Sequence, residues 1–376
     1  MAPVAAPPRR TPRPAPPGRR SRQARQALQR ASTRTSQERQ AADRAQRSRG
    51  RRLLIAGVAG VVVAVAAVAG TLAATSGGPA GPAALQLRTV TTASAVASVT
   101  DGLGSGWLVD DRNDTLVRFD PGTGRSTGPA VKVAGRPVAV TTGFGRVWVA
   151  SMLSDTVEEI APGAAGSAGE VVRTVQVPEG PSGLAVLDGR VWVASVIAGD
   201  LTAVDAATGR VATSTHLPQG AVRLAAGSGR LWVTGTADTV AAVDPRPSGG
   251  RLQWRTVTVG SGPLGVAVGD GSVWVADATA GTVAEVDPST YRVVRTFNTG
   301  PDPVAVAVSG GRTLVADGKT SKLTALPAAD GTSGNGTSNG GRTVSATLAG
   351  TPRQLVATSG GVWAAVGNPG AVVAVR

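Results

Sequence analysis

The sequence predicts an all-β fold over residues 85–376, a seven-bladed β-propeller with four-stranded antiparallel blades. The first observation is a repeat whose units are spaced 41, 44, 40, 42, 40 and 49 residues apart. Self-similarity at such a period is typical of propellers and solenoids, in which each unit buries its faces against copies of itself. The second is strand composition: residues 273–276 (VWVA) are apolar on both faces, as expected between packed sheets. The repeat is marked by a Trp or Leu in the second strand of each unit, namely Trp107, Trp148, Trp192, Trp232, Trp274, Leu314 and Trp363.

The clearest unit, residues 263–300, predicts four short strands at 266–268, 273–276, 283–286 and 293–296. The separators GDG, DATAG and DPST carry the Gly, Asp and Pro residues of tight turns. Four strands joined by hairpins in about 40 residues form one blade. Small residues in the first strand and a wide Trp in the second suit a ring that tapers toward its axis.

The two ends of the propeller predict how the ring closes. The last unit supplies only three strands, at 354–357, 362–365 and 371–375. Residues 85–92 (LQLRTVTT) match 252–259 (LQWRTVTV), which occupy the outermost-strand position of the fourth unit. Because unpaired edges invite aggregation, we expect residues 85–92 to complete the last blade as its outer strand.

The net charge of +14 is concentrated in a tail at residues 1–52. This tail holds 15 Arg against Glu38 and Asp43, whereas the remainder holds 23 basic and 22 acidic residues. The tail is rich in Pro and Arg and is predicted to be disordered. It is either a solvated charged segment or one that contacts anionic lipid headgroups. Because the basic charge is confined to the tail, we expect no nucleic-acid partner.

Residues 53–74 form an uncharged apolar run, long enough for a transmembrane helix. Arg51 and Arg52 precede it, so the positive-inside rule predicts a cytoplasmic N-terminus and an extracytoplasmic propeller. A cleaved signal peptide is the alternative, and the long charged lead favours a retained anchor. Residues 75–84 are expected to form a Gly/Pro linker, and the Arg-, Ala- and Gly-rich composition suggests a bacterial cell membrane protein.

Catalytic and metal-binding patterns are missing from the sequence. There is no cysteine, and His216 is the sole histidine, without acids at metal-ligand spacing. No nucleophile elbow, P-loop or dinucleotide fingerprint occurs between a strand and a helix. We therefore expect no catalytic residue, no metal and no cofactor.

A ligand site is predicted on one face of the ring. Acids or serines stand three residues after several of the Trp or Leu anchors, and charged residues lie in four of the loops that lead into the blades. The first set either hydrogen-bonds its own loops or rings one mouth of the central channel. The candidate ligand-binding residues are Asp110, Arg136, Ser151, Ser195, Arg223, Asp277, Asp302, Asp317 and Arg353.

The repeated pattern GxPxxVAV–GxVWVA–TVxxVDPxTGRV resembles the YVTN/YncE-like repeat propellers. It is also similar to the virginiamycin B (streptogramin) lyase propellers. Both resemblances cover residues 85–376 and imply the propeller fold. The lyase resemblance implies a metal-assisted enzyme with His and Glu on one face, but no position here matches a catalytic His with paired acids.

These observations predict a membrane-anchored, extracytoplasmic propeller that acts as a non-catalytic binding or scaffold module. Its expected partner is an extracytoplasmic protein or a cell-wall ligand. The alternative is a metal-dependent, streptogramin-lyase-like enzyme with a divergent site.

Overall fold

The computed structural model describes residues 84–164, 166–167, 169–248, 251–327 and 343–376. The chain divides between Ser76 and Gly77 into two units, and every described residue belongs to the second. Within these ranges no helix of a length and hydrophobicity to cross a bilayer is found. The predicted tail (1–52), the predicted membrane helix (53–74) and all but the last residue of the predicted linker (75–84) lie outside the described residues.

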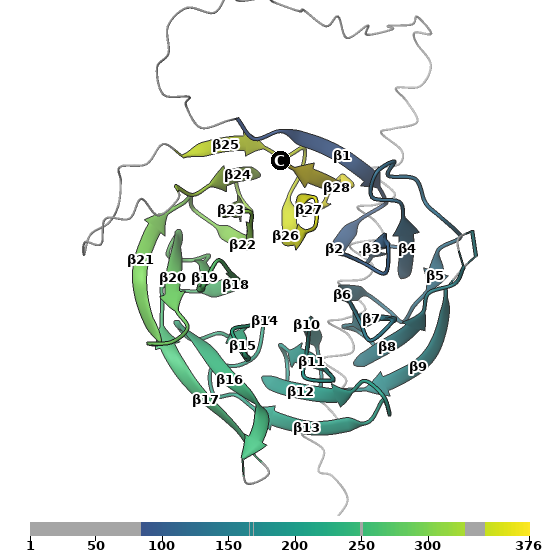
Figure 1. Ribbon diagram of the computed structural model, residues 1–376, viewed down its shortest axis with the longest axis horizontal. Helices are drawn as coiled ribbons and strands as arrows, with labels where there is room; N and C mark the ends of the chain where they lie inside the picture. Colours follow the sequence, from purple (N-terminus) through teal and green to yellow (C-terminus); the bar gives the residue numbers. More distant parts are fainter. Residues whose placement is uncertain (1–83, 165, 168, 249–250, 328–342) are drawn as a thin grey trace, which may run out of the picture. The chain divides into compact units, whose positions relative to one another are not determined.

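The described strands pair into seven antiparallel sheets of four, which confirms the predicted propeller. Figure 1 shows these sheets arranged around a central axis. In the first six blades the strands follow chain order from the axis outward. Blades 1 to 3 are β2 (Val96–Gly102), β3 (Ser105–Asp110), β4 (Thr115–Phe119) and β5 (Val131–Lys132); β6 (Pro137–Gly143), β7 (Arg146–Ser151), β8 (Thr156–Ala161) and β9 (Glu170–Gln176); and β10 (Pro181–Leu187), β11 (Arg190–Ser195), β12 (Asp200–Asp205) and β13 (Val211–His216). Blades 4 to 6 are β14 (Arg223–Gly227), β15 (Arg230–Thr234), β16 (Thr239–Ser248) and β17 (Arg251–Thr258); β18 (Pro263–Gly269), β19 (Ser272–Asp277), β20 (Thr282–Asp287) and β21 (Arg292–Asn298); and β22 (Pro303–Ser309), β23 (Arg312–Asp317), β24 (Lys322–Ala325) and β25 (Val344–Thr347).

The seventh blade is closed by the first strand of the described chain, as the sequence predicts. Its strands are β26 (Pro352–Thr358), β27 (Gly361–Gly367), β28 (Gly370–Val375) and, outermost, β1 (Leu87–Thr92). Leu87 lies opposite Val375 in the antiparallel β1–β28 pair. Gln86 and Arg376 extend the ladder through two further backbone hydrogen bonds of 3.0 and 3.1 Å. Both ends of the propeller domain are thereby held in one sheet.

The anchor side chains are buried between neighbouring blades. All seven are at most 6% exposed. Trp148 of blade 2 belongs to the same apolar cluster as Val191 and Val193 of blade 3. Its indole Nε1 donates a hydrogen bond to the Gly143 carbonyl at the end of the preceding strand, at 3.3 Å. Trp148 thus buries a large apolar area while its polar N–H finds a partner, so it ties two strands and two blades together.

Small residues near the axis allow the innermost strands to approach one another, as the predicted taper requires. A Cβ atom at Gly265 of β18 would lie only 2.8 Å from the Cα of Ala305 in the next blade. The outer strands face solvent instead: β13 alternates exposed and half-buried residues, whereas the anchor strand β11 is buried after its first residue. The inner wall is therefore the tightest part of the ring.

The closing strand supports a stability test. Val90 of β1 is buried against Trp363 and Val372, whereas the neighbouring Thr89 is exposed. Val90→Asp should lower the free energy of unfolding by about 3 kcal/mol or more, because it buries an unpaired carboxylate. Thr89→Asp, the matched control, should change it by about 0.5 kcal/mol or less. Urea unfolding measures both values, and equal effects would contradict the closure.

Candidate functional site

The predicted site residues gather on one face of the ring because of strand pairing. In the first six blades the first residue of the innermost strand lies opposite the last residue of the second strand, as in the pairs Pro303 with Asp317 and Pro263 with Asp277. In the seventh blade Pro352 lies opposite Val366, one residue before the end of β27. The loop that enters a blade and the loop after its second strand therefore meet at the same edge. We call this side of the ring, with the loops that contain Asp110, Arg136 and Asp317, face A.

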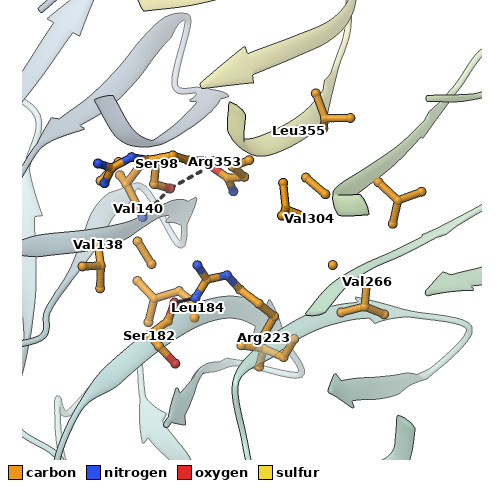
Figure 2. Close-up of a pocket in the computed structure, with 18 residues that line it drawn as sticks. Ser98, Val138, Val140, Ser182, Leu184, Arg223, Val266, Val304, Arg353 and Leu355 are labelled. Carbon is orange, nitrogen blue, oxygen red and sulfur yellow. Dashed lines mark hydrogen bonds between the residues drawn. The ribbon is translucent and has the colours of Figure 1, made fainter. Parts of the chain in front are cut away.

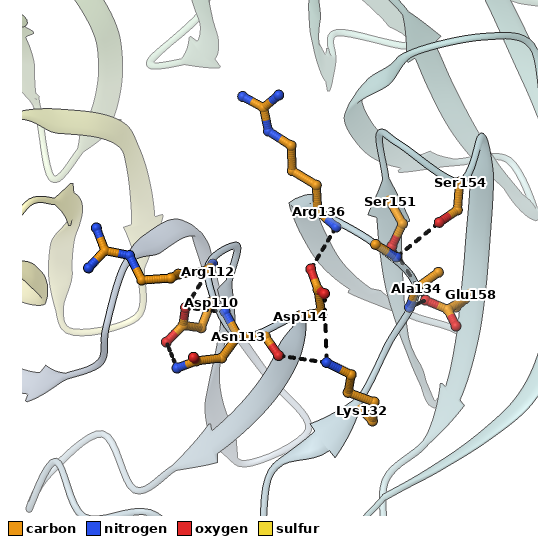
Figure 3. A network of polar contacts seen from close by, with 11 residues as sticks. Asp110, Arg112, Asn113, Asp114, Lys132, Ala134, Arg136, Ser151, Ser154 and Glu158 are labelled. Carbon is orange, nitrogen blue, oxygen red and sulfur yellow. Dashed lines mark hydrogen bonds and ion pairs between the residues drawn. The ribbon is translucent and has the colours of Figure 1, made fainter. Parts of the chain in front are cut away.

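Asp110 and Asp317 are buried and hold their own loops. The Asp317 carboxylate accepts hydrogen bonds from the backbone N–H groups of Asp302, Lys319 and Thr320 at 2.7–3.1 Å, and from the Thr320 hydroxyl. Burial raises the pKa of Asp317, but these hydrogen bonds outweigh it, so the pKa lies below its ordinary value. Asp110 accepts in the same way from Ser94, Arg112 and Asn113 (Figure 3). These are the loop hydrogen bonds that the structural interpretation of these positions predicts.

Asp277 occupies the same repeat position with far fewer hydrogen bonds. It is fully buried, its Oδ1 finds no partner among the described residues, and the Thr282 hydroxyl lies 3.3 Å from Oδ2. Burial raises its pKa from 3.8 to about 6, against the lowering effect of the Gly260 N–H. The loop therefore leaves the buried Asp277 carboxyl without a full set of hydrogen bonds.

Ser151 and Ser195 are likewise buried at the ends of their strands. The Ser195 hydroxyl donates to the Pro178 carbonyl at 2.9 Å, and the Ser151 hydroxyl lies 3.4 Å from Oε2 of Glu158. Glu158 also accepts the backbone N–H of Ala134 at 2.8 Å (Figure 3). Burial raises the pKa of Glu158. Both serines are engaged within the rim of the ring.

A cavity of about 100 Å³ lies on the ring axis, and Arg223 and Arg353 line it. Each of the seven innermost strands contributes to its wall, which is otherwise mostly Val, Leu, Ala and Gly. Figure 2 shows Arg223 beside Ser182 and Leu184, with Arg353 and Ser98 across the cavity. Ser98, Ser182 and Gln354 are the other polar residues of the lining, and none of its residues is acidic. The structure thus brings two of the nine candidate residues together on the axis.

The remaining two candidates lie on face A outside the cavity lining. Arg136 has a positive φ of 57°, and its N–H donates to the Asp114 carboxylate at 2.8 Å, which leaves its exposed side chain pointing away from the loop (Figure 3). Asp302 contacts Asp317 through its backbone N–H. No single pocket therefore unites the nine residues.

Sequence reasoning missed four residues that the structure makes prominent. Ser98 and Gln354 line the cavity, and Leu153 and Ile197 are 71% and 61% exposed on face A. A position-by-position alignment of the seven repeats would have revealed these residues, because each of them stands where most other repeats carry a different kind of side chain.

The sequence predicts no metal site at its sole histidine, His216. It lies at the end of the outer strand β13, exposed, with Nδ1 3.1 Å from the Asp200 carboxylate. In the ranges that the structure describes, no three His, Asp or Glu side chains are placed to share a metal ion. His216 is therefore remote from the axial cavity, on the outermost strand of its blade.

The described domain belongs by architecture to the seven-bladed β-propellers. The virginiamycin B lyase of Staphylococcus aureus is similar in structure, with a TM-score of 0.63, 13% identity and coverage of 78% of this chain and 98% of that one. So are the Pan2 WD40 domain of Neurospora crassa (0.59, 9%, 78% and 97%) and BamB of Moraxella catarrhalis (0.54, 14%, 75% and 85%). The predicted resemblance to the lyase propellers is confirmed for the fold alone. No family model and no curated protein sequence matches the chain, so the YVTN/YncE-like assignment stays a prediction.

Asp277 and Asp317 make opposite predictions. Because the folded-state pKa of Asp277 is raised to about 6, the folded protein binds the extra proton between about pH 4 and 6. Stability therefore falls as pH rises through this window. Asp277→Asn removes that penalty and should raise the free energy of unfolding by about 2 kcal/mol at pH 8, with no gain at pH 3.5.

Asp317→Asn is the matched comparison. An amide replaces one acceptor oxygen with a donor, so the loop of blade 6 loses hydrogen bonds and the variant should be less stable at pH 8. Thermal unfolding at the two pH values measures both effects. A loss of stability at pH 8 in Asp277→Asn as large as that in Asp317→Asn would contradict the assignment.

Proposed function

We propose that this chain is a membrane-anchored, extracytoplasmic propeller that binds a protein partner on face A without catalysing a reaction. The observation that carries the proposal is a patch over blades 1 to 3, formed by Arg112, Arg136, Leu153 and Ile197 and called the A-patch below. All four residues lie in face A loops, and all four are exposed.

The apolar part of the A-patch departs from the repeat. Leu153 and Ile197 stand two residues after the ends of β7 and β11. The same position holds Thr236, Thr279 and Lys319 in blades 4 to 6. Exposed large apolar side chains in two neighbouring blades, at a position that is polar in blades 4 to 6, are characteristic of a protein contact.

The charged part of the A-patch defines the partner's chemistry. Figure 3 shows the guanidinium groups of Arg112 and Arg136 extending from their loops, and no described acid forms an ion pair with either. Asp111, the acid next to Arg112, pairs instead with Arg353 at 2.8 Å. A partner with an apolar side chain flanked by carboxylates fits this surface, because complementary charges set orientation and association rate.

The acids and serines of face A support binding over catalysis. The carboxylates of Asp110 and Asp317 accept hydrogen bonds from their own loops, and the Ser195 hydroxyl donates one to a loop carbonyl. All three residues are buried. A general acid or base has to reach a substrate proton, and these groups are turned into the protein. The rigid rim that they maintain holds the A-patch residues in fixed relative positions.

The location of the propeller is proposed from the sequence. Residues 53–74 are the proposed membrane anchor, with Arg51 and Arg52 on the cytoplasmic side. The partner is then an envelope protein, and a cell-wall ligand is the other occupant that this location permits.

The A-patch predicts a specific loss of binding. Membranes containing full-length protein should yield, after crosslinking in intact cells, an envelope protein that the double variant Leu153→Asp and Ile197→Asp recovers at least 10-fold less. Val294→Asp, on the outer strand β21 where Val294 is 51% exposed, is the matched control and should recover the wild-type amount. Equal recovery by the double variant and the control would refute the A-patch.

The anchor predicts a topology. In cells that make the full chain, protease added outside spheroplasts should digest the propeller, while the N-terminal tail stays protected. Val63→Arg places a charge at the centre of the run, which costs about 3 kcal/mol on insertion, and should shift protein to the soluble fraction. A propeller protected from the protease would contradict the proposed location.

A further inference from the structure

The inner wall of the ring has a repeat position that is Gly or Ala in four of the seven blades. This position pairs with the residue two after the Trp or Leu anchor. It lies two residues after the start of the innermost strand in six blades, and in blade 4 it is the first residue of that strand. At Gly183 and Gly265 the next blade lies close, because an added Cβ atom would be 2.8 Å from the Leu224 side chain and from the Ala305 Cα atom, respectively. The four small residues and their partners are Ala139 with Ala150, Gly183 with Ala194, Gly265 with Ala276 and Ala305 with Ala316.

Three blades place a polar side chain at this position instead: Ser98, Arg223 and Gln354, opposite Val109, Thr234 and Ala365. All three line the axial cavity. Since the packing of the ring needs no polar group here, these exceptions point to a ligand.

The Gln354 amide has a fixed orientation. Its Oε1 accepts hydrogen bonds from the Ser98 hydroxyl and from the Val99 backbone N–H, both at 2.9 Å. A backbone N–H only donates, so the atom that faces it is the carbonyl oxygen and not the amide nitrogen. The Ser98 hydroxyl is also engaged, because it accepts the Val140 N–H at 3.2 Å. The Nε2 group of Gln354 remains as a donor without a partner among the described residues.

Arg223 is a cation without a counter-ion. Its Nη1 donates to the Ser182 carbonyl at 2.7 Å and lies 3.4 Å from the Val222 carbonyl. Its Nε and Nη2 donate to nothing in the part of the chain that the structure describes. Burial lowers the pKa of Arg223, which reflects the cost of holding a charge away from water. Two carbonyl dipoles fix the guanidinium but do not neutralise it.

The second arginine of the cavity is already neutralised. The Nη1 of Arg353 lies 2.8 Å from Oδ2 of Asp111, across the junction of blades 7 and 1. The uncompensated charge of the cavity is therefore that of Arg223. With no acid in the lining, the cavity presents donors and a positive charge but almost no free acceptor.

We propose that the axial cavity binds a small oxyanion, a carboxylate or a phosphate, between the Arg223 guanidinium and the Gln354 amide. A guanidinium presents a planar fork of N–H donors that matches the oxygens of both anions. A water needs only roughly 10–15 Å³ of such volume, so a cavity of about 100 Å³ admits an anion of a few heavy atoms. This site is independent of the A-patch and goes beyond the proposed function.

The test uses the full-length chain in detergent and follows the thermal unfolding of the propeller. Sodium phosphate and sodium acetate are titrated separately against sodium chloride at equal ionic strength, so that general screening is matched. The wild-type midpoint should rise with at least one of the two anions and saturate, and the arm that responds identifies the anion class. If neither anion raises it above chloride, the proposal is overturned.

Two variants locate the site. Gln354→Glu keeps the acceptor oxygen that Ser98 and Val99 share but replaces the free amide donor with a negatively charged oxygen, so it should fold and bind the anion at least 10-fold more weakly. Arg223→Gln should weaken binding by a similar factor. The matched controls on exposed outer strands, Gln176→Glu and Arg292→Gln, should bind as wild type does.

Each outcome of these measurements either supports or overturns the proposed anion site. Wild-type anion affinity in Gln354→Glu, or an equal loss in the outer-strand controls, would overturn the proposal. If Arg223→Gln does not fold, Gln354→Glu alone decides. Loss of partner binding by the A-patch variant, with the anion response unchanged, would support the independence of the two sites.

Discussion

The packing of each blade against the next, closed where β1 pairs with β28, is the constraint on which the rest of the structure depends. A single sheet here has two apolar faces, and it is stable in water only between two others. The junction of blades 7 and 1 shows the contacts that hold neighbouring blades together. Phe119 and Trp363 lie with ring centroids 5.4 Å apart, Val90 belongs to the same cluster, and Gln354 and Arg353 reach across to Ser98 and Asp111.

A closed ring of repeats leaves few positions free for function. The Gly, the anchor Trp and the Asp at the strand end serve the repeat, so function is expected where one blade departs from the others. Arg223 and Gln354 depart from a Gly or Ala position on the inner wall, and Leu153 and Ile197 from a mostly polar position on face A. The two departures are of different chemistry, which is why we propose different partners for them: a small anion on the axis and a protein surface at the rim.

Most of the fold was predictable because short sequence motifs mark its blades and strands. The Trp spacing marks the blades, and the match between 85–92 and 252–259 indicated the closing strand. Strand lengths were less predictable: β5 has only two residues while β16 has ten, since the pairing of outer strands depends on where each loop returns. The common face of the candidate site followed from strand pairing alone. Side-chain partners did not, because they depend on residues distant in sequence: Arg353 meets Asp111, 242 residues away.

The closure of the ring can be measured directly, because the chain contains no cysteine. Leu87 and Val375 lie opposite each other in the β1–β28 pair and pack in the same apolar cluster. In the double variant Leu87→Cys and Val375→Cys, air oxidation should form an intramolecular disulfide and raise the thermal midpoint, since it closes a very long loop. Thiols that remain free after oxidation of the folded protein would contradict the closed ring.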